Sequence, residues 1–254
     1  MAEFAGASGT IHYTDQGQGD ALILVHGFAA SAQENWGRAG WISMLTRAGR
    51  RVIAVDLLGH GLSAKPPDPV AYSIAQLGAD IHQLRETLEL KKPDLIGFSL
   101  GGRIVLDLLL RHGDRYLLGV LCGAGERWMQ PQERDPEALP RAFEAETADA
   151  IPEGMARNFR LFADAQGQDR LALAALARGL QAAGPVTHWE RLADITNEVL
   201  VIAGRADELA GDPLALAQRM PRGKSVVVPA CGHMDCLTQP MFKAAVMDFL
   251  AGEV

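Results

Sequence analysis

Cysteine is scarce in this sequence, and long apolar runs are missing. Three cysteines among 254 residues are too few for a disulfide framework, so we expect a reducing, cytoplasmic location. No apolar stretch reaches the roughly 20 residues that a membrane-spanning helix needs. Residues 1–6 have neither a basic start nor an apolar segment, and we therefore expect no signal peptide. These features disfavour a secreted disulfide-rich protein and an integral membrane protein.

Basic residues are fewer than acidic ones: 24 lysines and arginines stand against 31 aspartates and glutamates. A formal net charge of −7 disfavours nucleic acids and anionic membranes as partners.

Cys231 and Cys236 have four residues between them, which is not the usual two-residue spacing of a zinc site. We expect these side chains to pack among small residues and predict no metal site. The chain length fits one α/β domain with an insertion.

The most informative motif is Gly-x-Ser-x-Gly at residues 97–101, which lies between two apolar segments. Residues 94–98 have the pattern of a strand, and residues 104–110 have the apolar content of a helix. This order is typical of a nucleophile elbow, a tight turn that lifts one serine hydroxyl above a sheet. Glycines on both sides leave room for the crowded backbone. We therefore predict that Ser99 is a nucleophile in a strained backbone conformation.

A nucleophilic serine needs a basic partner, and the base needs an acid that orients it. In proteins with such an elbow the chain order is serine, acid, histidine. Among the seven histidines, His233 alone follows a late apolar β-branched run and a glycine turn. Asp207 follows another apolar run and a glycine, so we predict it as the acid. Glu208 and Asp212 are the near alternatives.

A third apolar run, residues 21–25, ends in His26-Gly27-Phe28. Acyl transfer needs two N–H groups that point at the developing oxyanion. We predict that the backbone N–H groups of Phe28 and Leu100 supply them. The ring of Phe28 is then available to line a substrate pocket.

Together these segments resemble the serine-type α/β-hydrolase family. The matching segments occur in the family's order over nearly the whole chain: residues 26–28, Asp56 to Ser63, residues 97–101, Gly204 to Asp207, and Gly232-His233. The resemblance implies a mostly parallel central sheet flanked by helices, with an inserted helical cap. It points to the branch of small esterases, carbon–carbon bond hydrolases and cofactor-free haloperoxidases. Relatives that are dehalogenases or epoxide hydrolases use aspartate as the nucleophile, and Ser99 disfavours both chemistries.

In this family the segment from Asp56 to Ser63 mostly shapes the loop beside the elbow. We therefore assign no catalytic role to His60.

Strand and helix patterns alternate along the chain, which favours a parallel sheet with crossover helices. We predict strands at Gly9–Thr14 (an edge strand), Ala21–Val25, Arg51–Asp56, Asp94–Phe98 and Tyr116–Cys122. We predict helices at Trp36–Ala48, at Ser73–Leu90 with Ser73 as the N-cap, and at about residues 213–220.

Strand patterns are missing from residues 126–196, and short helical stretches replace them. We predict that residues 1–125 and 197–254 form the α/β core and that residues 126–196 form the cap. Apolar residues of a cap either hold it together or contact substrate. We predict that five side chains line an apolar pocket: Phe28, Trp128, Met129, Phe159 and Phe162.

The predicted function is hydrolysis of a carboxylic ester, or a close acyl substrate, without a cofactor. One alternative is cleavage of a carbon–carbon bond next to a ketone in a diketone or dienoate. That reaction would need polar groups from the candidates Arg103, Arg127, Arg157 or Arg160. A second alternative is a small-molecule receptor or signalling protein on the same scaffold. Cofactor-free perhydrolysis would need only a pocket that admits peroxide.

Overall fold

The computed structural model describes residues 2–130, 135–183 and 189–253. Within them, eight strands form one sheet in the order β1-β2-β4-β3-β5-β6-β7-β8. The strands are β1 (Ala2–Gly6), β2 (Gly9–Gln16), β3 (Ala21–Val25), β4 (Arg51–Val55), β5 (Asp94–Phe98), β6 (Leu118–Cys122), β7 (Glu198–Gly204) and β8 (Gly223–Val228). The pairs β1–β2 and β2–β4 are antiparallel, and all the others are parallel. The predicted mostly parallel sheet is confirmed.

Helices connect and cover these strands. The α-helices are α1 (Trp41–Arg47), α2 (Ile74–Thr87), α3 (Leu100–His112), α4 (Ala138–Glu144), α5 (Met155–Ala165), α6 (Arg170–Ala182), α7 (Pro213–Ala217) and α8 (Pro240–Leu250). A π-helical turn, η1 (Gln33–Arg38), precedes α1. Short 3-10 turns are η2 (Pro69–Ala71), η3 (Gly113–Arg115), η4 (Glu126–Trp128), η5 (Ala148–Ala150), η6 (Trp189–Asp194) and η7 (Cys236–Thr238).

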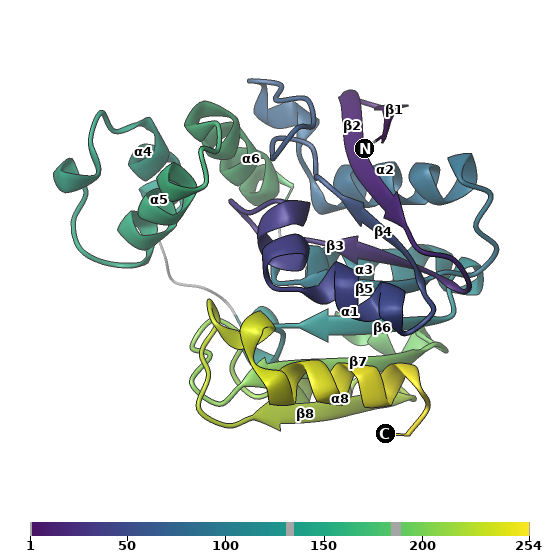
Figure 1. Cartoon of the computed structure of the whole chain (residues 1–254). Helices are drawn as coiled ribbons and strands as arrows, with labels where there is room; N and C mark the ends of the chain where they lie inside the picture. The colour runs from purple at the N-terminus through teal and green to yellow at the C-terminus, as the bar shows by residue number, and fades with distance from the viewer. Residues whose placement is uncertain (1, 131–134, 184–188, 254) are drawn as a thin grey trace.

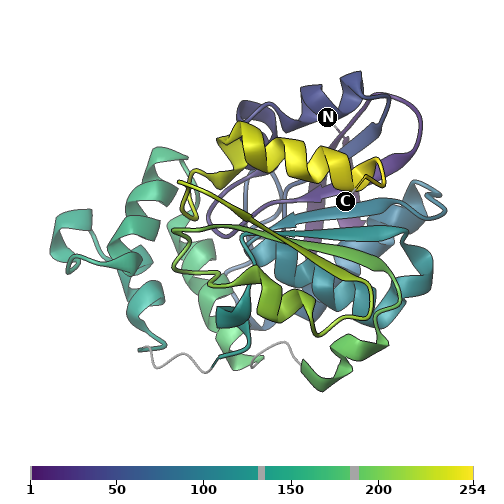
Figure 2. The same cartoon turned by 90° about the horizontal axis from the view of Figure 1, so that it is seen from below.

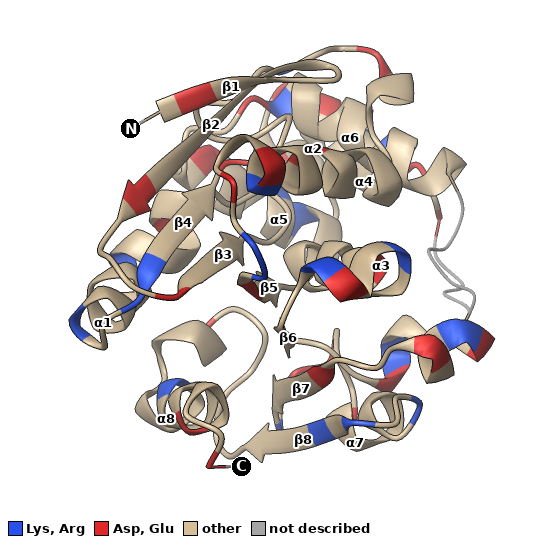
Figure 3. Cartoon of the chain, turned by 90° about the vertical axis from the view of Figure 1, so that its right-hand side faces the viewer, with Lys and Arg blue, Asp and Glu red and all other residues tan. Residues whose placement is uncertain are grey.

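The central strands are buried on both faces because helices cover each side. Alternate residues point to opposite faces, as in any strand. Ile23 and Val25 therefore belong to a core cluster that includes residues of α2, α3 and α7, whereas Leu22 and Leu24 belong to one that includes residues of α1 and α8. Figure 2 shows the yellow helix α8 on one face of the sheet and the blue-green helix α3 on the other. Strands β3 and β6 carry no charged residue (Figure 3).

The order of the strands creates a place for a site. The chain runs from β3 to β4 on one side and then returns to β5 on the other side of β3. In open α/β sheets, the carboxyl ends of the strands at such a reversal leave a crevice for ligands. Phe28 lies just after β3 and Ser99 just after β5, so both lie at this reversal.

Helices α4, α5 and α6 form the helical segment, residues 135–183. Figure 1 shows these three helices grouped together at one side of the sheet. Phe143, Ala163 and Leu173 form a small buried cluster with Ala29 from the loop after β3, so the segment is packed onto that loop. Residues 131–134 and 184–188 of the predicted cap lie outside the described residues.

Several predicted boundaries were wrong. Strand β2 is not at the edge, because β1 pairs outside it. The predicted helix Trp36–Ala48 is two shorter pieces, η1 and α1, because Gly40 adopts a left-handed φ of 78° between them. Helix α2 does begin after Ser73, whose hydroxyl accepts a hydrogen bond from the N–H of Gln76. It ends at Thr87, since Glu89 has a φ of 52° that no α-helix accommodates.

Four further boundaries differ by up to three residues: β6 begins at Leu118, whereas β2 ends at Gln16, β4 at Val55 and α7 at Ala217. All three cysteines are free and buried. Among residues 2–130, 135–183 and 189–253, no helix combines the length and the apolar character that crossing a membrane requires.

Candidate active site

Ser99 occupies the tight turn between β5 and α3. Its φ of 52° and ψ of −110° are rare for a residue with a side chain, and such strain is found mainly at functional positions. The Ser99 N–H donates to the carbonyl of Cys122 at 2.9 Å. A Cβ on Gly97 would lie 2.2 Å from the carbonyl oxygen of Gly101, and one on Gly101 would lie 2.1 Å from that of Val25. The glycines of the motif are therefore required by the close packing of the backbone.

His233 and Asp207 come from the ends of neighbouring strands, β8 and β7. The Nδ1 atom of His233 lies 2.8 Å from Oδ2 of Asp207. The other oxygen of Asp207 accepts the N–H groups of Leu209 at 3.0 Å and Ala210 at 2.9 Å. These bonds fix the carboxylate, which fixes the imidazole in turn. Because Nδ1 is engaged by Asp207, Nε2 is the nitrogen left for a substrate or a nucleophile.

The two alternative acids lie elsewhere. Glu208 is exposed to solvent. Asp212 caps helix α7, where its side chain accepts the N–H of Leu214 at 2.9 Å. Of the three candidate carboxylates, Asp207 is the one that contacts His233.

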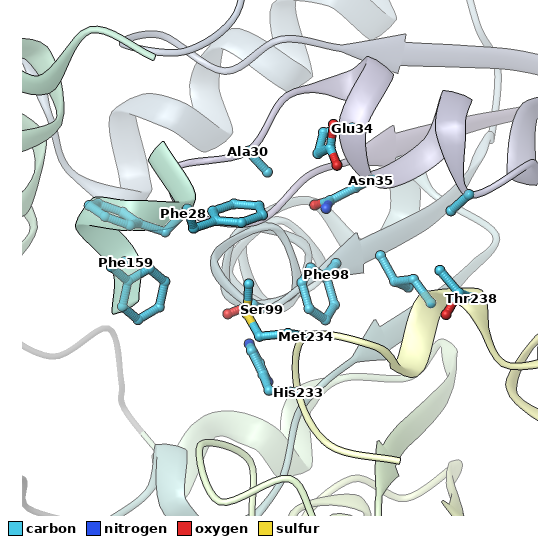
Figure 4. A pocket seen from close by; sticks show the side chains of 13 residues that line it. Phe28, Ala30, Glu34, Asn35, Phe98, Ser99, Phe159, His233, Met234 and Thr238 are labelled. Atoms are coloured by element: carbon cyan, nitrogen blue, oxygen red, sulfur yellow. The ribbon is translucent and has the colours of Figure 1, made fainter. Parts of the chain in front are cut away.

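Ser99 and His233 line one narrow pocket of about 100 Å³. Three aromatic rings predicted to contact substrate, those of Phe28, Phe159 and Phe162, also line it. Figure 4 shows the side chains of Ser99 and His233 in the same part of this pocket, with the side chain of Met234 drawn between them. The structure thus brings the predicted nucleophile, the predicted base and a hydrophobic wall to one place.

The loop after β3 is held by two side chains that flank Phe28. The N–H of Gly27 donates to Oδ1 of Asn35 at 2.8 Å, and the N–H of Ala29 donates to Nε2 of His60 at 3.0 Å. The intervening peptide of Phe28 is therefore fixed on both sides. Leu100 is the first residue of α3, where N–H groups have no acceptor within the helix. Both amides suit an anion-binding role.

Two buried histidines beside this loop are structural partners. His60 accepts from Ala29, and His26 accepts the N–H of Leu57 at Nε2, 3.0 Å away. Their Nδ1 atoms face carbonyl oxygens, so each ring is the neutral Nδ1-protonated tautomer. Burial lowers the pKa of His26 and lowers that of His60 well below its ordinary value. Neither histidine is placed to act as a base.

Asp56 fixes the neighbouring loop. Its carboxylate accepts the N–H of Ala32 at 2.8 Å and the N–H of Leu62 at 3.0 Å. A Cβ on Gly61 would lie 2.3 Å from this carboxylate, so glycine is needed there. The roles of Asn35 and of the histidine contacts were not predicted from the sequence. The only signal for His26, Asp56 and His60 was that they lie within segments that match the family.

Trp128 and Met129 do not line the Ser99 pocket, although we predicted that they would contact substrate. Trp128 is buried in the core cluster between the sheet and α3, and Met129 packs against that cluster. The guanidinium of Arg103 lies 5.0 Å from the Trp128 ring. A Cβ on Gly102 of α3 would lie only 2.8 Å from the Trp128 ring, so this ring packs tightly against α3 and contributes to the core.

A second, larger cavity of about 640 Å³ is also lined by His233. It shares Phe159, His233 and Met234 with the narrow pocket, so the two spaces meet at the imidazole. Its wall includes the polar residues Arg127, Asn158 and Glu208.

The fold and this arrangement of residues define a hydrolase class, and the sequence comparison agrees. The chain belongs to the family of the alpha/beta hydrolase fold, whose sequence model matches residues 20–178. The predicted family and fold are therefore confirmed.

Individual relatives carry out different reactions. The chain is 29% identical to 2-hydroxymuconate semialdehyde hydrolase of Pseudomonas putida, over 97% of this chain and 92% of that protein. It is 27% identical to a putative 2-succinyl-6-hydroxy-2,4-cyclohexadiene-1-carboxylate synthase of Bacillus subtilis, over 91% and 90%. Among solved structures, a hydrolase from Pseudomonas aeruginosa has a TM-score of 0.80 at 26% identity, covering 98% of this chain and 97% of that one.

Proposed function

We propose that this protein hydrolyses carboxylic esters through an acyl-enzyme formed on Ser99. One observation carries the proposal. Ser99, whose backbone is strained at the elbow, lines the same pocket as His233, and the Nδ1 atom of His233 contacts the buried carboxylate of Asp207. A serine, a base and an orienting acid are the parts that nucleophilic acyl transfer requires.

The proposed reaction has two halves. The Ser99 hydroxyl attacks the ester carbonyl as its proton passes to Nε2 of His233. The imidazolium, stabilised by Asp207, then gives that proton to the departing alcohol. Water, deprotonated by His233, next attacks the acyl group and releases the acid, and Ser99 regains its proton. The N–H groups of Phe28 and Leu100 would hold the oxyanion, and each such donor is worth about 3 kcal/mol at the transition state.

The helical segment belongs to this proposal as a cap. Residues 126–196 are inserted between β6 and β7, and their helix α5 supplies Phe159 and Phe162 to the pocket wall. A cap in this position shields the reacting carbonyl from bulk water, which strengthens the interactions with the oxyanion. The substrate is accordingly a small molecule with an apolar part.

Cleavage of a carbon–carbon bond next to a ketone is the second candidate. Of the four arginines considered, Arg103 stacks on Trp128, and Arg157 and Arg160 pair with Asp149 and Asp164. Arg127 lines the larger cavity beside His233, where a cation would suit the carboxylate of a dienoate. The names of relatives such as 2-hydroxymuconate semialdehyde hydrolase agree with this chemistry.

Hydrolysis of 4-nitrophenyl esters, from acetate to dodecanoate, tests the main proposal. We expect turnover by the wild type, and none above background by a folded Ser99→Ala variant. Labelling with a fluorophosphonate would report a reactive Ser99 independently of any substrate. A labelled wild-type protein that consumes a dienoate ketone much faster than every ester would favour the second candidate. Turnover that persists in Ser99→Ala would overturn the mechanism.

A further inference from the structure

The two cavities beside His233 differ in size and in the site residues that they contact. The narrow one, about 100 Å³, is lined by both Ser99 and His233. The wide one, about 640 Å³, is lined by His233, and Ser99 does not contribute to it. Ligand pockets for drug-sized molecules measure roughly 300–1,000 Å³, so the wide cavity is of ordinary size and the narrow one is small.

The mechanism decides which part of an ester enters which cavity. The acyl group becomes bonded to Ser99, so it must lie in a space that Ser99 lines. The leaving oxygen takes a proton from His233, so the alcohol part must depart on the imidazole side. We infer that the acyl group occupies the narrow pocket and the alcohol part the wide cavity, which makes the protein selective for esters of short, uncharged acids with bulky alcohols. This inference rests on the proposed function.

Aromatic rings set the limit on acyl length. Phe28 and Phe98 come from the ends of β3 and β5, and Phe159 and Phe162 come from α5. The Phe28 ring also contacts those of Phe143 and Phe159, at centroid distances of 5.7 Å in both cases. Because the Phe28 ring is supported by two other rings, this part of the wall resists displacement by a longer chain.

Charge sets the second limit. Glu34 lines the narrow pocket, and its side chain, which ends in a carboxylate, is only 21% exposed. Its partner, Arg38 Nη1 at 2.8 Å, belongs to a side chain that is 65% exposed, so solvent weakens the neutralising effect. An acyl group that carries its own carboxylate would bring a like charge into a poorly hydrated space. The pocket therefore favours uncharged acids.

The wide cavity places no such limits on the alcohol part. Arg127 and Glu208 offer both signs of charge, and Asn158 offers an amide that donates and accepts hydrogen bonds. A bulky alcohol part with polar groups fits this lining.

The acyl-length profile tests the size limit. With 4-nitrophenyl esters we expect kcat/KM to be highest between acetate and butanoate and at least tenfold lower at octanoate. Phe162→Ala should move the maximum to longer chains, because it removes a ring from the wall. Leu161→Ala is the matched control, since this neighbour on α5 is exposed and does not line the pocket. A wild-type maximum at octanoate or beyond would overturn the inference and leave the proposed function standing.

Failure of the proposed function would look different: no ester of any length would be turned over in a Ser99-dependent way, although Ser99 still reacts with a fluorophosphonate.

The charge limit is tested by comparing benzyl butanoate with the benzyl monoester of succinic acid. We expect the wild type to prefer the butanoate at least tenfold in kcat/KM. Glu34→Gln should reduce that preference at least threefold. An unchanged preference in Glu34→Gln, or a wild type that prefers the succinate ester, contradicts the assigned role of Glu34.

Discussion

The buried carboxylate of Asp207 illustrates how single residues set the chemistry of this site. One oxygen accepts two backbone N–H groups, and the other faces Nδ1 of His233. An amide at this position would keep its oxygen on the N–H groups and turn its NH₂ toward the ring. The ring would then carry its proton on Nε2 and could no longer accept the proton of Ser99.

Asp207→Asn should therefore lower kcat for a 4-nitrophenyl ester by a factor on the order of 10³–10⁴ while the protein stays folded. Circular dichroism would check the fold. Asp212→Asn is the matched control, because an asparagine can still cap α7 and this position does not contact the imidazole. Comparable losses in both variants would show that Asp207 has no special role.

His60 gives a prediction about stability at acidic pH. Burial holds its pKa well below the ordinary value of about 6.5, so the folded protein does not take up the proton that the unfolded chain binds. The free energy of unfolding should therefore fall as the pH decreases below about 6.5, with each such histidine contributing up to about 1.4 kcal/mol per pH unit.

Urea unfolding between about pH 7 and pH 5 would measure this effect. His60→Gln keeps an acceptor for the Ala29 N–H but cannot titrate, so its free energy of unfolding should decline less steeply than that of the wild type. Parallel curves for the two proteins would mean that His60 takes up its proton equally in the folded and unfolded states, which would contradict the lowered pKa.

Sequence patterns could indicate some of these residues and not others. Ser99 directly follows an apolar strand, and Asp207 and His233 each follow an apolar strand and a glycine turn, which are local patterns. Asn35 and His60 act on amides that are 8 and 31 residues away in the chain. No periodicity indicates such contacts, because they depend on how the loops meet in space.

At the scale of elements, strand ends could be predicted better than helix breaks. The strand β5 has the bounds that its apolar run predicted. The break between η1 and α1 was missed because Trp36 and Trp41 are both buried, with their rings 5.8 Å apart. Apolar spacing therefore continues across Gly40, although the backbone does not.

The loop between α5 and α6 attaches the helical segment to the core. Gln168 donates to the carbonyl of Ala30 at 3.1 Å and accepts the N–H of Gly61 at 3.1 Å. One side chain thus joins the loop that carries Phe28 to the loop that follows Asp56. A contact in this position would couple the cap to the proposed oxyanion donor.

Gln168→Ala should lower kcat/KM for a short-chain ester several-fold and speed hydrogen exchange at the amide of Gly61. The free energy of unfolding should fall by only about 1–2 kcal/mol, which is typical of one or two lost hydrogen bonds. Gln181→Ala is the control, because Gln181 donates to Pro136 outside the loops that Gln168 joins. If both variants lose turnover equally, Gln168 stabilises the segment without positioning the site.

At the scale of the whole molecule, the sheet could be predicted from the sequence. Which apolar side chains pack in the core and which line the pocket could not. Alternating strands and helices indicate a parallel sheet whatever the function. Phe159 and Trp128 are both large aromatic residues in the inserted region, yet Phe159 lines the pocket and Trp128 packs in the core. Composition places such residues in the interior, and only the folded chain determines which surface they face.

Mass spectrometry of the acid-quenched reaction with 4-nitrophenyl acetate would test the central claim most directly. We predict one acetyl group on the peptide that contains Ser99, formed within the burst of 4-nitrophenol release. The same experiment with His233→Ala should show little or no acetyl group, since the serine then has no base. Rapid turnover with no acyl group on Ser99, or with the acyl group on another residue, would contradict the account.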